Sequence, residues 1–262
     1  MSQVFHAPEG FLTSQIRVQL VGCGGTGSHL ADQLARVDVT LRNLGHEGLA
    51  VELWDFDRVS TSNLGRQRFT AADVGHYKSM LLAHRINVFH GLDWKAQTTA
   101  FRPQHLRCDL LMTATDSALF RAHLGRHFRR RQSNALWIDT GNGASTGQMI
   151  LGHLSGISRS AGIRLPNVFD LFPELANMQK ADREEPSCSM DEAIRRQELP
   201  INLLMATSAS TLLWNLLRHG QIDHHGAIID SRPLTIRSMP IDAKTWAMYG
   251  YQSPKPSKKK AA

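Results

Sequence analysis

The feature that most constrains the fold is a glycine-rich segment, GCGGTG at residues 22–27, which directly follows a short apolar run, IRVQLV at residues 16–21. The apolar run predicts a buried β-strand, and the residues from His29 onward have the pattern of a helix. A strand that enters a helix through a glycine turn is typical of phosphate-binding proteins, because glycines let the main chain approach an oxyanion. The glycine motif alone is also compatible with a tight turn that binds no ligand.

Strands and helices alternate along the chain. Further strands are predicted over residues 49–56, 94–101, 110–115, 135–140, 148–154, 227–229 and 234–236, of which 148–154 is expected to be antiparallel. Helices are predicted over residues 74–88, 117–131 and 201–218, the last nearly apolar and closed by Gly220. This order predicts an α/β fold with a doubly wound, Rossmann-like, mostly parallel sheet that carries helices on both faces.

Length and charge indicate one domain over residues 1–262, with residues 155–200 as a crossover or lid insertion and residues 253–262 as a disordered basic tail. The net charge is +7, and much of it comes from the lysines of the tail. The rest is not basic enough to predict nucleic-acid binding, which is expected only through the tail. The chain contains three cysteines, no CxxC pair and no apolar run of membrane length, which favours a cytoplasmic protein.

The polar residues that could bind a ligand follow the predicted strands. Asp55 and Asp57 follow the second strand and Asp116 follows the strand at 110–115, and ligands of doubly wound sheets bind at such strand ends. If residues 63–67 form one helical turn, Asn63, Arg66 and Gln67 share a face. Lys78 lies on the polar face of the next helix. This set of donors predicts a clamp for a triphosphate, and the alternatives are a solvated polar loop or an NAD-dependent oxidoreductase.

The motifs GxGGxG, DxDxVxxSNLxRQxF and DVGxxK, followed by an aspartate at the end of a later strand, resemble the adenylation domain shared by ThiF, MoeB and the ubiquitin-activating (E1-like) enzymes. The resemblance covers residues 16–116. A later segment, PSCS…EA…Q…N, is similar in particular to the ThiF-family protein of the PRTRC (ParB-related, ThiF-related cassette) system.

The resemblance implies a role for each matching residue. The turn residues Gly22, Gly24, Gly25 and Gly27 would pack against the nucleotide phosphates. Asp55 would bind the ribose, with Asp57 beside it, and Asp116 would hold Mg²⁺. The triphosphate would be surrounded by Asn63, Arg66, Gln67 and Lys78. The residues with a direct part in catalysis would be Arg66, Lys78, Asp116 and Cys188.

The implied reaction is attack by a carboxylate on the α-phosphate of ATP, which gives an acyl-adenylate and pyrophosphate. In many members the carboxylate is the C-terminal glycine of a ubiquitin-like protein, and many members form homodimers. Two alternatives stay open: adenylation of a small molecule or an RNA base without a thioester, and a nucleotide-binding, non-catalytic subunit of a plasmid-associated complex. No zinc is expected, because the paired CxxC motifs of many members are missing.

Cys188 is the candidate for thioester formation. Ser189 and Glu192 have the spacing of a capping box, which predicts a helix that starts just after Cys188 and lowers the pKa of the thiol. Nearby acidic residues would raise that pKa, and a lone cysteine is also often a small buried hydrophobe. The packing interpretation is preferred for Cys23 and Cys108.

Several other charged residues have weaker interpretations. The pairs His123 and His127, on a helix, and His224 and His225, in an expected loop, lack partners for a metal site, and partial exposure is expected. The arginines at 126 and 129–131 are read as a solvated helix end, with docking of an acidic partner as the alternative. Homodimeric members lend an N-terminal arginine to the partner's phosphates. Residues 1–15 contain no Arg or Lys, so Arg17 is a candidate replacement.

Overall fold

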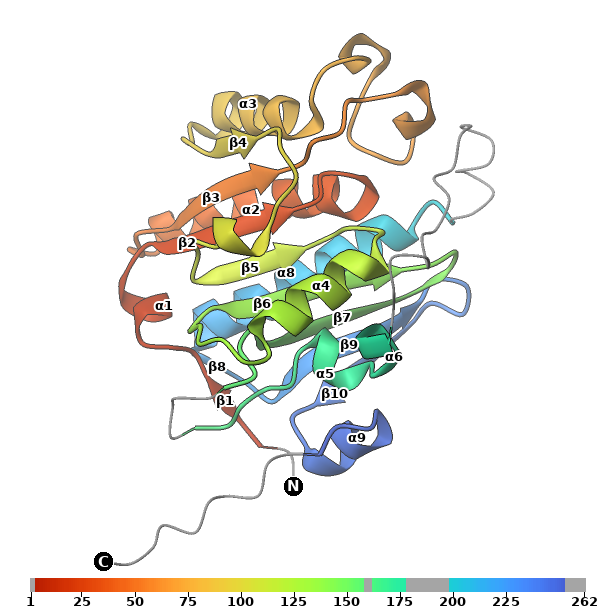
Figure 1. Cartoon of the computed structure of the whole chain (residues 1–262). Coiled ribbons are helices and arrows are strands. Elements are labelled where there is room, and N and C mark those ends of the chain that lie inside the picture. Colours follow the sequence, from red (N-terminus) through yellow and green to blue (C-terminus); the bar gives the residue numbers. More distant parts are fainter. Residues whose placement is uncertain (1–2, 158–161, 178–197, 253–262) are drawn as a thin grey trace, which may run out of the picture.

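An eight-stranded sheet with the order β10-β9-β7-β6-β5-β2-β3-β4 forms the centre of the molecule in the computed structural model. The structure describes residues 3–157, 162–177 and 198–252 (Figure 1). Five neighbouring strands run parallel: β2 (Ile16–Val21), β3 (Leu49–Trp54), β4 (Lys95–Gln97), β5 (Leu110–Thr113) and β6 (Leu136–Asn142). Three antiparallel pairings then add β7 (Thr146–His153), β9 (His224–Asp230) and β10 (Thr235–Pro240).

Helices cover both faces of this sheet. On one face α2 (Gly25–Asn43) packs against α8 (Ile201–His219), which also contacts β6, β7 and β9. On the other face lies α4 (Ala118–Phe128), in contact with the short α5 (Val168–Leu171) and α6 (Glu174–Asn177). The helix α3 (Lys78–His90) packs against β3, β4 and α2. The prediction of a doubly wound, mostly parallel α/β sheet is therefore confirmed.

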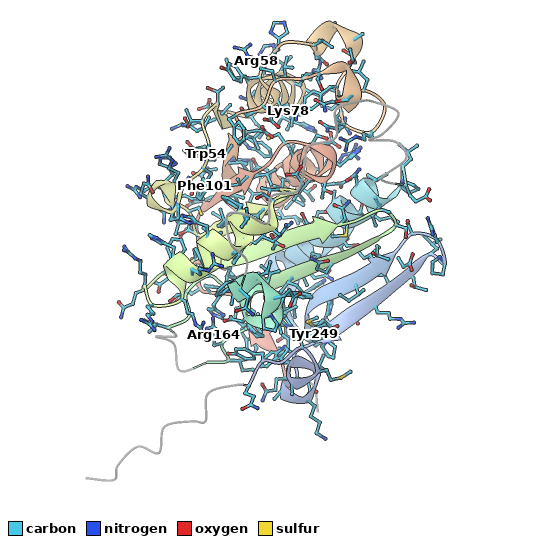
Figure 2. All side chains as sticks on the ribbon, turned by 45° about the vertical axis from the view of Figure 1, so that its right-hand side comes forward. Trp54, Arg58, Lys78, Phe101, Arg164 and Tyr249 are labelled. Carbon is cyan, nitrogen blue, oxygen red and sulfur yellow. The ribbon has the colours of Figure 1, made fainter. Side chains whose placement is uncertain are left out.

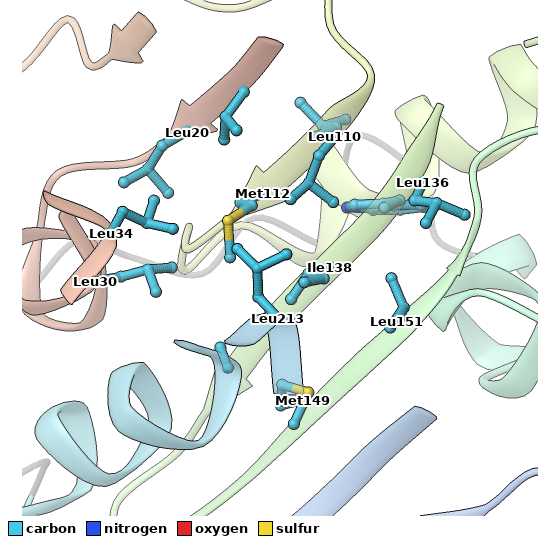
Figure 3. Packing of buried hydrophobic residues seen from close by; sticks show 14 of the residues in the cluster. Leu20, Leu30, Leu34, Leu110, Met112, Leu136, Ile138, Met149, Leu151 and Leu213 are labelled. Carbon is cyan, nitrogen blue, oxygen red and sulfur yellow. The ribbon is translucent and has the colours of Figure 1, made fainter. Parts of the chain in front are cut away.

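The central strands are apolar because both of their faces are covered. Every residue of β5 is buried, and β2 and β6 are buried along nearly their whole length. Figure 3 shows how Leu30 and Leu34 of α2 and Leu213 of α8 meet the strand residues Met112 and Ile138. Such uninterrupted apolar strands are typical of parallel sheets under two helical layers.

Short elements complete the fold at the periphery. They are β1 (Phe5–His6), α1 (Gly10–Thr13), β8 (Gln221–Ile222), α9 (Ala243–Met248) and the 3-10 turns η1 (Thr61–Asn63), η2 (Ala71–Asp73) and η3 (Pro103–His105). The η3 turn lies over β3, where the ring of His105 stacks on Trp54 and Phe101 meets Trp54 edge-on with centroids 5.2 Å apart (Figure 2).

The structure corrects the predictions for the helix over residues 74–88 and for the histidines at 224 and 225. The helix predicted over residues 74–88 begins at Lys78 and ends at His90, because Val74 to Tyr77 belong to the loop that follows η2. His224 and His225 open strand β9 instead of lying in a loop, and His225 is fully buried. Its Nδ1 contacts the carbonyl oxygen of Leu151 and its Nε2 accepts the indole N–H of Trp246, so the imidazole belongs to the core.

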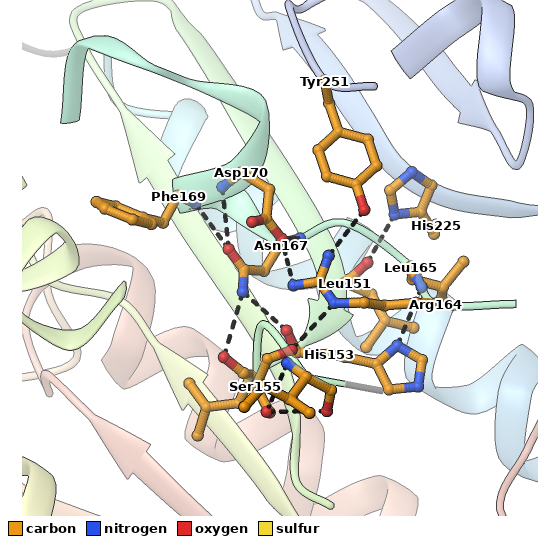
Figure 4. A network of polar contacts seen from close by, with 12 residues as sticks. Leu151, His153, Ser155, Arg164, Leu165, Asn167, Phe169, Asp170, His225 and Tyr251 are labelled. Carbon is orange, nitrogen blue, oxygen red and sulfur yellow. Dashed lines mark hydrogen bonds and ion pairs between the residues drawn. The ribbon is translucent and has the colours of Figure 1, made fainter. Parts of the chain in front are cut away.

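A polar network ties residues 164–170 to the end of β7, where the N–H of Leu165 donates to Nδ1 of His153 and Nδ2 of Asn167 donates to the carbonyl of His153 (Figure 4). The guanidinium of Arg164 donates to the carbonyl of Ser155, to the carboxylate of Asp170 and to the hydroxyl of Tyr251. Arg126 of α4 donates to the carbonyls of residues 175 and 176 in α6, so it is not simply a solvated helix end.

The order of the strands places a topological switch point between β2 and β5. From β2 the chain moves outward to β3 and β4, whereas β5 lies on the opposite side of β2 and leads to β6. Helices α2 and α4 consequently leave the carboxyl ends of adjacent strands on opposite faces, which opens a crevice there. The glycine turn and Asp116 both lie at this edge.

Candidate functional site

The glycine turn leads from the end of β2 directly into α2. Gly22 has a φ of +94°, which favours glycine, and α2 begins at Gly25, earlier than the sequence predicts. A Cβ on Gly27 would lie 1.9 Å from the carbonyl oxygen of Gly22, and one on Gly25 would lie 2.7 Å from the side chain of Asn202. The first turn of this 19-residue helix holds no acidic residue, so its N–H groups and positive dipole end suit an anion.

Asp55 joins the glycine turn to the end of β3. Its Oδ2 accepts the main-chain N–H of Cys23 at 2.6 Å, and its Oδ1 accepts that of Asp57 at 2.8 Å. Burial raises the pKa of this carboxyl, while Lys78 and the two N–H donors act in the opposite direction. A carboxylate oxygen has more than one acceptor position, so Asp55 can also bind a hydroxyl.

Lys78 reaches the same place from the N-terminus of α3. The sequence places it on a polar helix face, but its side chain is only 8% exposed, and its Nζ lies 3.2 Å from Oδ2 of Asp57. The preceding segment is fixed by Arg58, whose guanidinium lies 4.0 Å from the ring centroid of Tyr77 (Figure 2). The lysine therefore sits at the carboxyl end of β3 as a nearly buried, positioned cation.

Residues 63–67 do not form the single helical turn that the sequence predicts. η1 ends at Asn63, Leu64 is extended and Gly65 turns the chain with a φ of +82°. The loop closes on itself, because Oδ1 of Asn63 accepts the N–H of Ser60 and the N–H of Gln67 donates to the carbonyl of Asn63. Asn63 and Gln67 are buried all the same, and Nε2 of Gln67 lies 3.9 Å from the position that a Gly24 Cβ would take.

The charge of Asp116 acts on the guanidinium of Arg66. Burial lowers the pKa of the Arg66 guanidinium, and the charge of Asp116 raises it. Asp116 follows β5 and is exposed, next to Ser117, whose Oγ accepts the N–H of Phe120 and caps α4. The loop, the glycine turn and the end of β5 thus bring a cation, an anion and a helix N-terminus together.

Three polar residues at the glycine turn were given no role by sequence reasoning. Oγ1 of Thr26 donates to Oδ1 of Asn142 and to Oδ1 of Asn202, each at 3.1 Å. Asn142 ends β6 and Asn202 lies in the first turn of α8. The available signal was position, because Asn142 ends a parallel strand at the same edge of the sheet as the predicted site.

The remaining candidates lie elsewhere. Arg17 is at the amino end of β2, away from the glycine turn, and pairs with Asp109 at 2.7 Å, so it does not replace a phosphate-binding arginine within the chain. Burial raises the pKa of Cys23 and brings that of Cys108 to about 12, in agreement with packing roles. Cys188, Ser189 and Glu192 lie outside the described residues, as does the tail 253–262.

The donor set fits a nucleotide triphosphate with Mg²⁺. Among the described residues, the buried Oε1 of Gln67, on the side chain beside Gly24, has no hydrogen-bond partner. This oxygen is an acceptor, so it suits a hydroxyl or amino group of a nucleotide and not a phosphate oxygen. The same part of the chain contains no group of three or more His, Cys, Asp or Glu side chains placed to hold a metal. Mg²⁺ is commonly held by one or two carboxylates together with substrate phosphates, and Asp116 can supply such a carboxylate.

Comparison with known proteins yields a family match and several structural neighbours. The model of the ThiF family matches residues 12–246. The ATP-dependent ubiquitin transferase-like protein Cap2 of Escherichia coli (strain TW11681) is 35% identical over 99 residues, which are 37% of this chain and 16% of Cap2.

Among solved structures, E. coli MccB with ATP gives a TM-score of 0.60 at 16% identity, covering 94% of this chain and 67% of MccB. PaaA gives a TM-score of 0.56 at 16% identity, covering 87% of this chain and 64% of PaaA. The chain thus spans a small part of Cap2 and roughly two thirds of these structures. Within the described residues, no helix has the length and apolar character needed to cross a membrane.

Proposed function

This chain belongs to the ThiF family, and from that premise we propose that it uses ATP to adenylate a carboxylate. The observation that carries the proposal is the convergence at one sheet edge of the glycine turn, Asp55 and the buried Lys78, with Arg66 and Asp116 close enough for their charges to interact. A nicotinamide cofactor carries only a pyrophosphate, which a glycine turn and a helix N-terminus already serve. Two further cations and an acidic residue suit a triphosphate with its metal ion.

The proposed reaction is a displacement at the α-phosphorus. A carboxylate oxygen of the substrate bonds to the α-phosphorus, the bond to the oxygen that bridges the α- and β-phosphates breaks, and pyrophosphate leaves with that electron pair. Such a transfer needs mainly positioning and compensation of the leaving group's charge. The glycine turn would hold the phosphates, Asp55 a ribose hydroxyl, and Arg66 and Lys78 would offset the charge that develops on pyrophosphate.

Mg²⁺ would be held by Asp116 and the phosphates, and when bound it would neutralise phosphate charge. Asn63 and Gln67 would contribute in two ways. Their buried amides shape the loop that carries Arg66, and Gln67 has a polar atom available for the nucleotide. Asp57 would lie beside the ribose with Asp55 and would also orient Lys78, with whose ammonium its carboxylate pairs.

The acyl substrate that we propose is the C-terminal glycine of a ubiquitin-like protein, and the proposed acceptor of the acyl group is the thiol of Cys188, as a thioester. Two names support a macromolecular or peptide-like acceptor: Cap2 is described as ubiquitin transferase-like, and MccB has been crystallised with MccA. We also propose a single adenylation domain over residues 1–262, able to form a homodimer, with residues 155–200 as its crossover segment. The motif around Cys188 supports membership of a PRTRC cassette.

ATP–pyrophosphate exchange tests the adenylation. Purified protein is incubated with Mg²⁺, ATP, labelled pyrophosphate and candidate partners that end in a free carboxylate, with the amidated form of each partner as the control. We expect label in ATP only with the free carboxylate, and loss of exchange in Asp116→Asn. Asp109→Asn, at the opposite end of β5, should retain exchange. Exchange that survives in Asp116→Asn, or that proceeds with amidated partners, contradicts the proposal.

The thioester is tested separately, because it is not required for exchange. Wild-type protein and Cys188→Ala are incubated with ATP and an active partner, then separated with and without a reducing thiol. A thiol-sensitive conjugate that is lost in Cys188→Ala while exchange persists supports the thioester. Exchange without any conjugate in the wild type would indicate adenylation alone.

A further inference from the structure

We propose that Arg121 is a positioning residue, which fixes the main chain on the amino side of Asp116 and thereby sets the metal-binding carboxylate. The inference rests on the role proposed above for Asp116. Arg121 projects from α4 and its side chain is 8% exposed, while the carboxylate of Asp139 on β6 is 1% exposed. Nε of Arg121 donates to both oxygens of Asp139, at 2.9 and 2.8 Å. This ion pair lies in the core and has no part in the site described so far.

The same guanidinium also donates hydrogen bonds to the main chain at the carboxyl ends of two strands. Nη2 of Arg121 donates to the carbonyl of Thr115 at 2.7 Å and to that of Thr140 at 2.8 Å. The carbonyl of Thr115 belongs to the peptide unit whose nitrogen is that of Asp116. The carbonyl of Thr140 lies two residues before Asn142, which contacts Thr26 in the glycine turn. One planar group therefore links the carboxyl ends of β5 and β6 directly behind the site.

The anchor of this guanidinium is itself fixed. Asp139 accepts the hydroxyl of Thr113, and Oγ1 of Thr113 accepts the indole N–H of the fully buried Trp137 at 2.8 Å. The residues just before this peptide lie against the glycine turn, because a Cβ on Gly22 would lie 2.5 Å from the carbonyl oxygen of Ala114 and 3.3 Å from Cγ2 of Thr115. A change at Arg121 would therefore move Asp116 relative to the phosphate cradle.

Stability alone does not explain a buried pair of this kind. Removing two charges from water is costly, and well-packed apolar residues in their place are often at least as stabilising. Apolar residues donate no hydrogen bonds, and a lysine ammonium cannot donate several of them in one fixed plane as the planar guanidinium of arginine does. The buried arginine therefore serves to fix the positions of two main-chain carbonyls. Groups that orient a metal ligand in this way commonly change metal affinity 10–100-fold when mutated.

The test compares ATP binding with and without Mg²⁺ by isothermal titration calorimetry, so it needs no acyl substrate. We expect Mg²⁺ to tighten ATP binding to the wild type. In Arg121→Lys the ratio of the ATP affinities with and without Mg²⁺ should fall about tenfold. The affinity for ATP without Mg²⁺ should stay within about twofold of the wild-type value. The matched control is Arg42→Lys on α2. Arg42 pairs with the fully buried Asp38 and donates to a main-chain carbonyl, but at the other end of the sheet. In Arg42→Lys, Mg²⁺ should increase the affinity for ATP as much as it does in the wild type.

A second variant keeps the test decisive if Arg121→Lys fails to fold. The double substitution Arg121→Met with Asp139→Leu removes the buried charges together, should keep the thermal transition, and should lose the Mg²⁺ effect to the same extent. The inference is overturned if either variant folds and keeps the full Mg²⁺ effect, or if Arg42→Lys loses it equally. Wild-type protein that binds no ATP at all would instead refute the proposed function, so the two failures are distinguishable.

Discussion

At the scale of single residues, the site depends on side chains whose position the local sequence does not reveal. Lys78 looks like a residue on the polar face of an amphipathic helix, because hydrophobic spacing extends back to Val74. The structure starts the helix at Lys78 and buries the ammonium beside Asp57. The chemical type of the residue was predictable from the motif, whereas its burial depends on Arg58 and Tyr77, which close the preceding loop.

Gly25 offers a direct test of the phosphate cradle. A Cβ there would lie 2.7 Å from the side chain of Asn202, which is bonded to Thr26. We expect Gly25→Ala to force Asn202 and the glycine turn apart at a cost of about 1–3 kcal/mol, and to weaken ATP binding by the corresponding factor of about 5 to 150. Gly10→Ala is the control, because nothing lies within 4 Å of a Cβ at that position. Unchanged ATP affinity in a folded Gly25→Ala protein would place the phosphates elsewhere.

The pH dependence of ATP binding tests the coupling of Lys78 to Asp55. Burial raises the pKa of Asp55, and the charge of Lys78 opposes that rise. The carboxylate form accepts the N–H of Cys23 and of Asp57, so ATP binding should weaken as the pH falls through the pKa of Asp55. In Lys78→Gln that pKa rises further, and the acid limb of the binding curve should move to higher pH. Lys244→Gln, on α9, is the control and should not shift the pH at which ATP binding weakens. If this pH is also unchanged in Lys78→Gln, Lys78 does not act on the pKa of Asp55.

At the scale of elements, the long apolar segments were predictable and the short ones were not. β2, β3, β5, β6 and α8 carry apolar patterns strong enough to identify them. The turn η1 and the elements β1, β8, α1 and α9 are each too short to be stable alone, so tertiary contacts decide them. The same reason explains the error at residues 63–67, where Gly65 and the bond from Ser60 to Asn63 override the expected helical turn.

The loop over residues 60–77, which carries Arg66 and Gln67, is held by a brace. Asp73 accepts the N–H and the hydroxyl of Thr70 and pairs with Arg85, which also donates to the carbonyl of Arg68. Although burial acts against it, these bonds keep the pKa of Asp73 below its ordinary value. The brace therefore joins the loop to α3 without using any residue assigned to the nucleotide.

Removing the brace should loosen the loop before it unfolds the protein. We expect Asp73→Asn to lower stability by about 1–3 kcal/mol and to speed amide hydrogen exchange over residues 60–77, with weaker ATP binding as the consequence. Asp109→Asn removes a more exposed ion pair just before β5 and should leave exchange in the loop unchanged. Equal exchange rates in the loop of Asp73→Asn and wild type would contradict the brace.

At the scale of the whole molecule, the switch point between β2 and β5 gathers groups that are far apart in sequence. The motifs indicated that Gly25, Asp55 and Asp116 would meet, because each follows a parallel strand. Asn142 lies outside the recognised motifs, Asn202 ends the motif PSCS…EA…Q…N without an assigned role, and Arg121 lies in the helix predicted over residues 117–131, also without a role. Their placement follows from how α4 and α8 pack on opposite faces of the sheet, which hydrophobic periodicity does not determine.

Acid should destabilise the folded molecule through its buried histidines. Burial lowers the pKa of His225 to about 4, below the 6.5 of an exposed imidazole, so the unfolded chain binds more protons between these values. Stability is then lost as the pH falls from about 6.5 towards 4, and the loss is about 2 kcal/mol at pH 5 for this residue. His225→Gln should narrow the difference in Tm between pH 7.5 and pH 5. His84→Gln, on the exposed face of α3, is the control, and an unchanged difference in His225→Gln would count against this account.

The central claim is that the cations at this sheet edge bind a triphosphate. Titration calorimetry with ATP and with AMP measures it directly, on wild-type protein and on the double variant Arg66→Gln with Lys78→Gln. The account predicts that ATP binds the wild type at least about tenfold more tightly than AMP, and that the double variant loses most of this difference. Equal affinities for ATP and AMP in the wild type, or an ATP preference that the double variant retains, would contradict it.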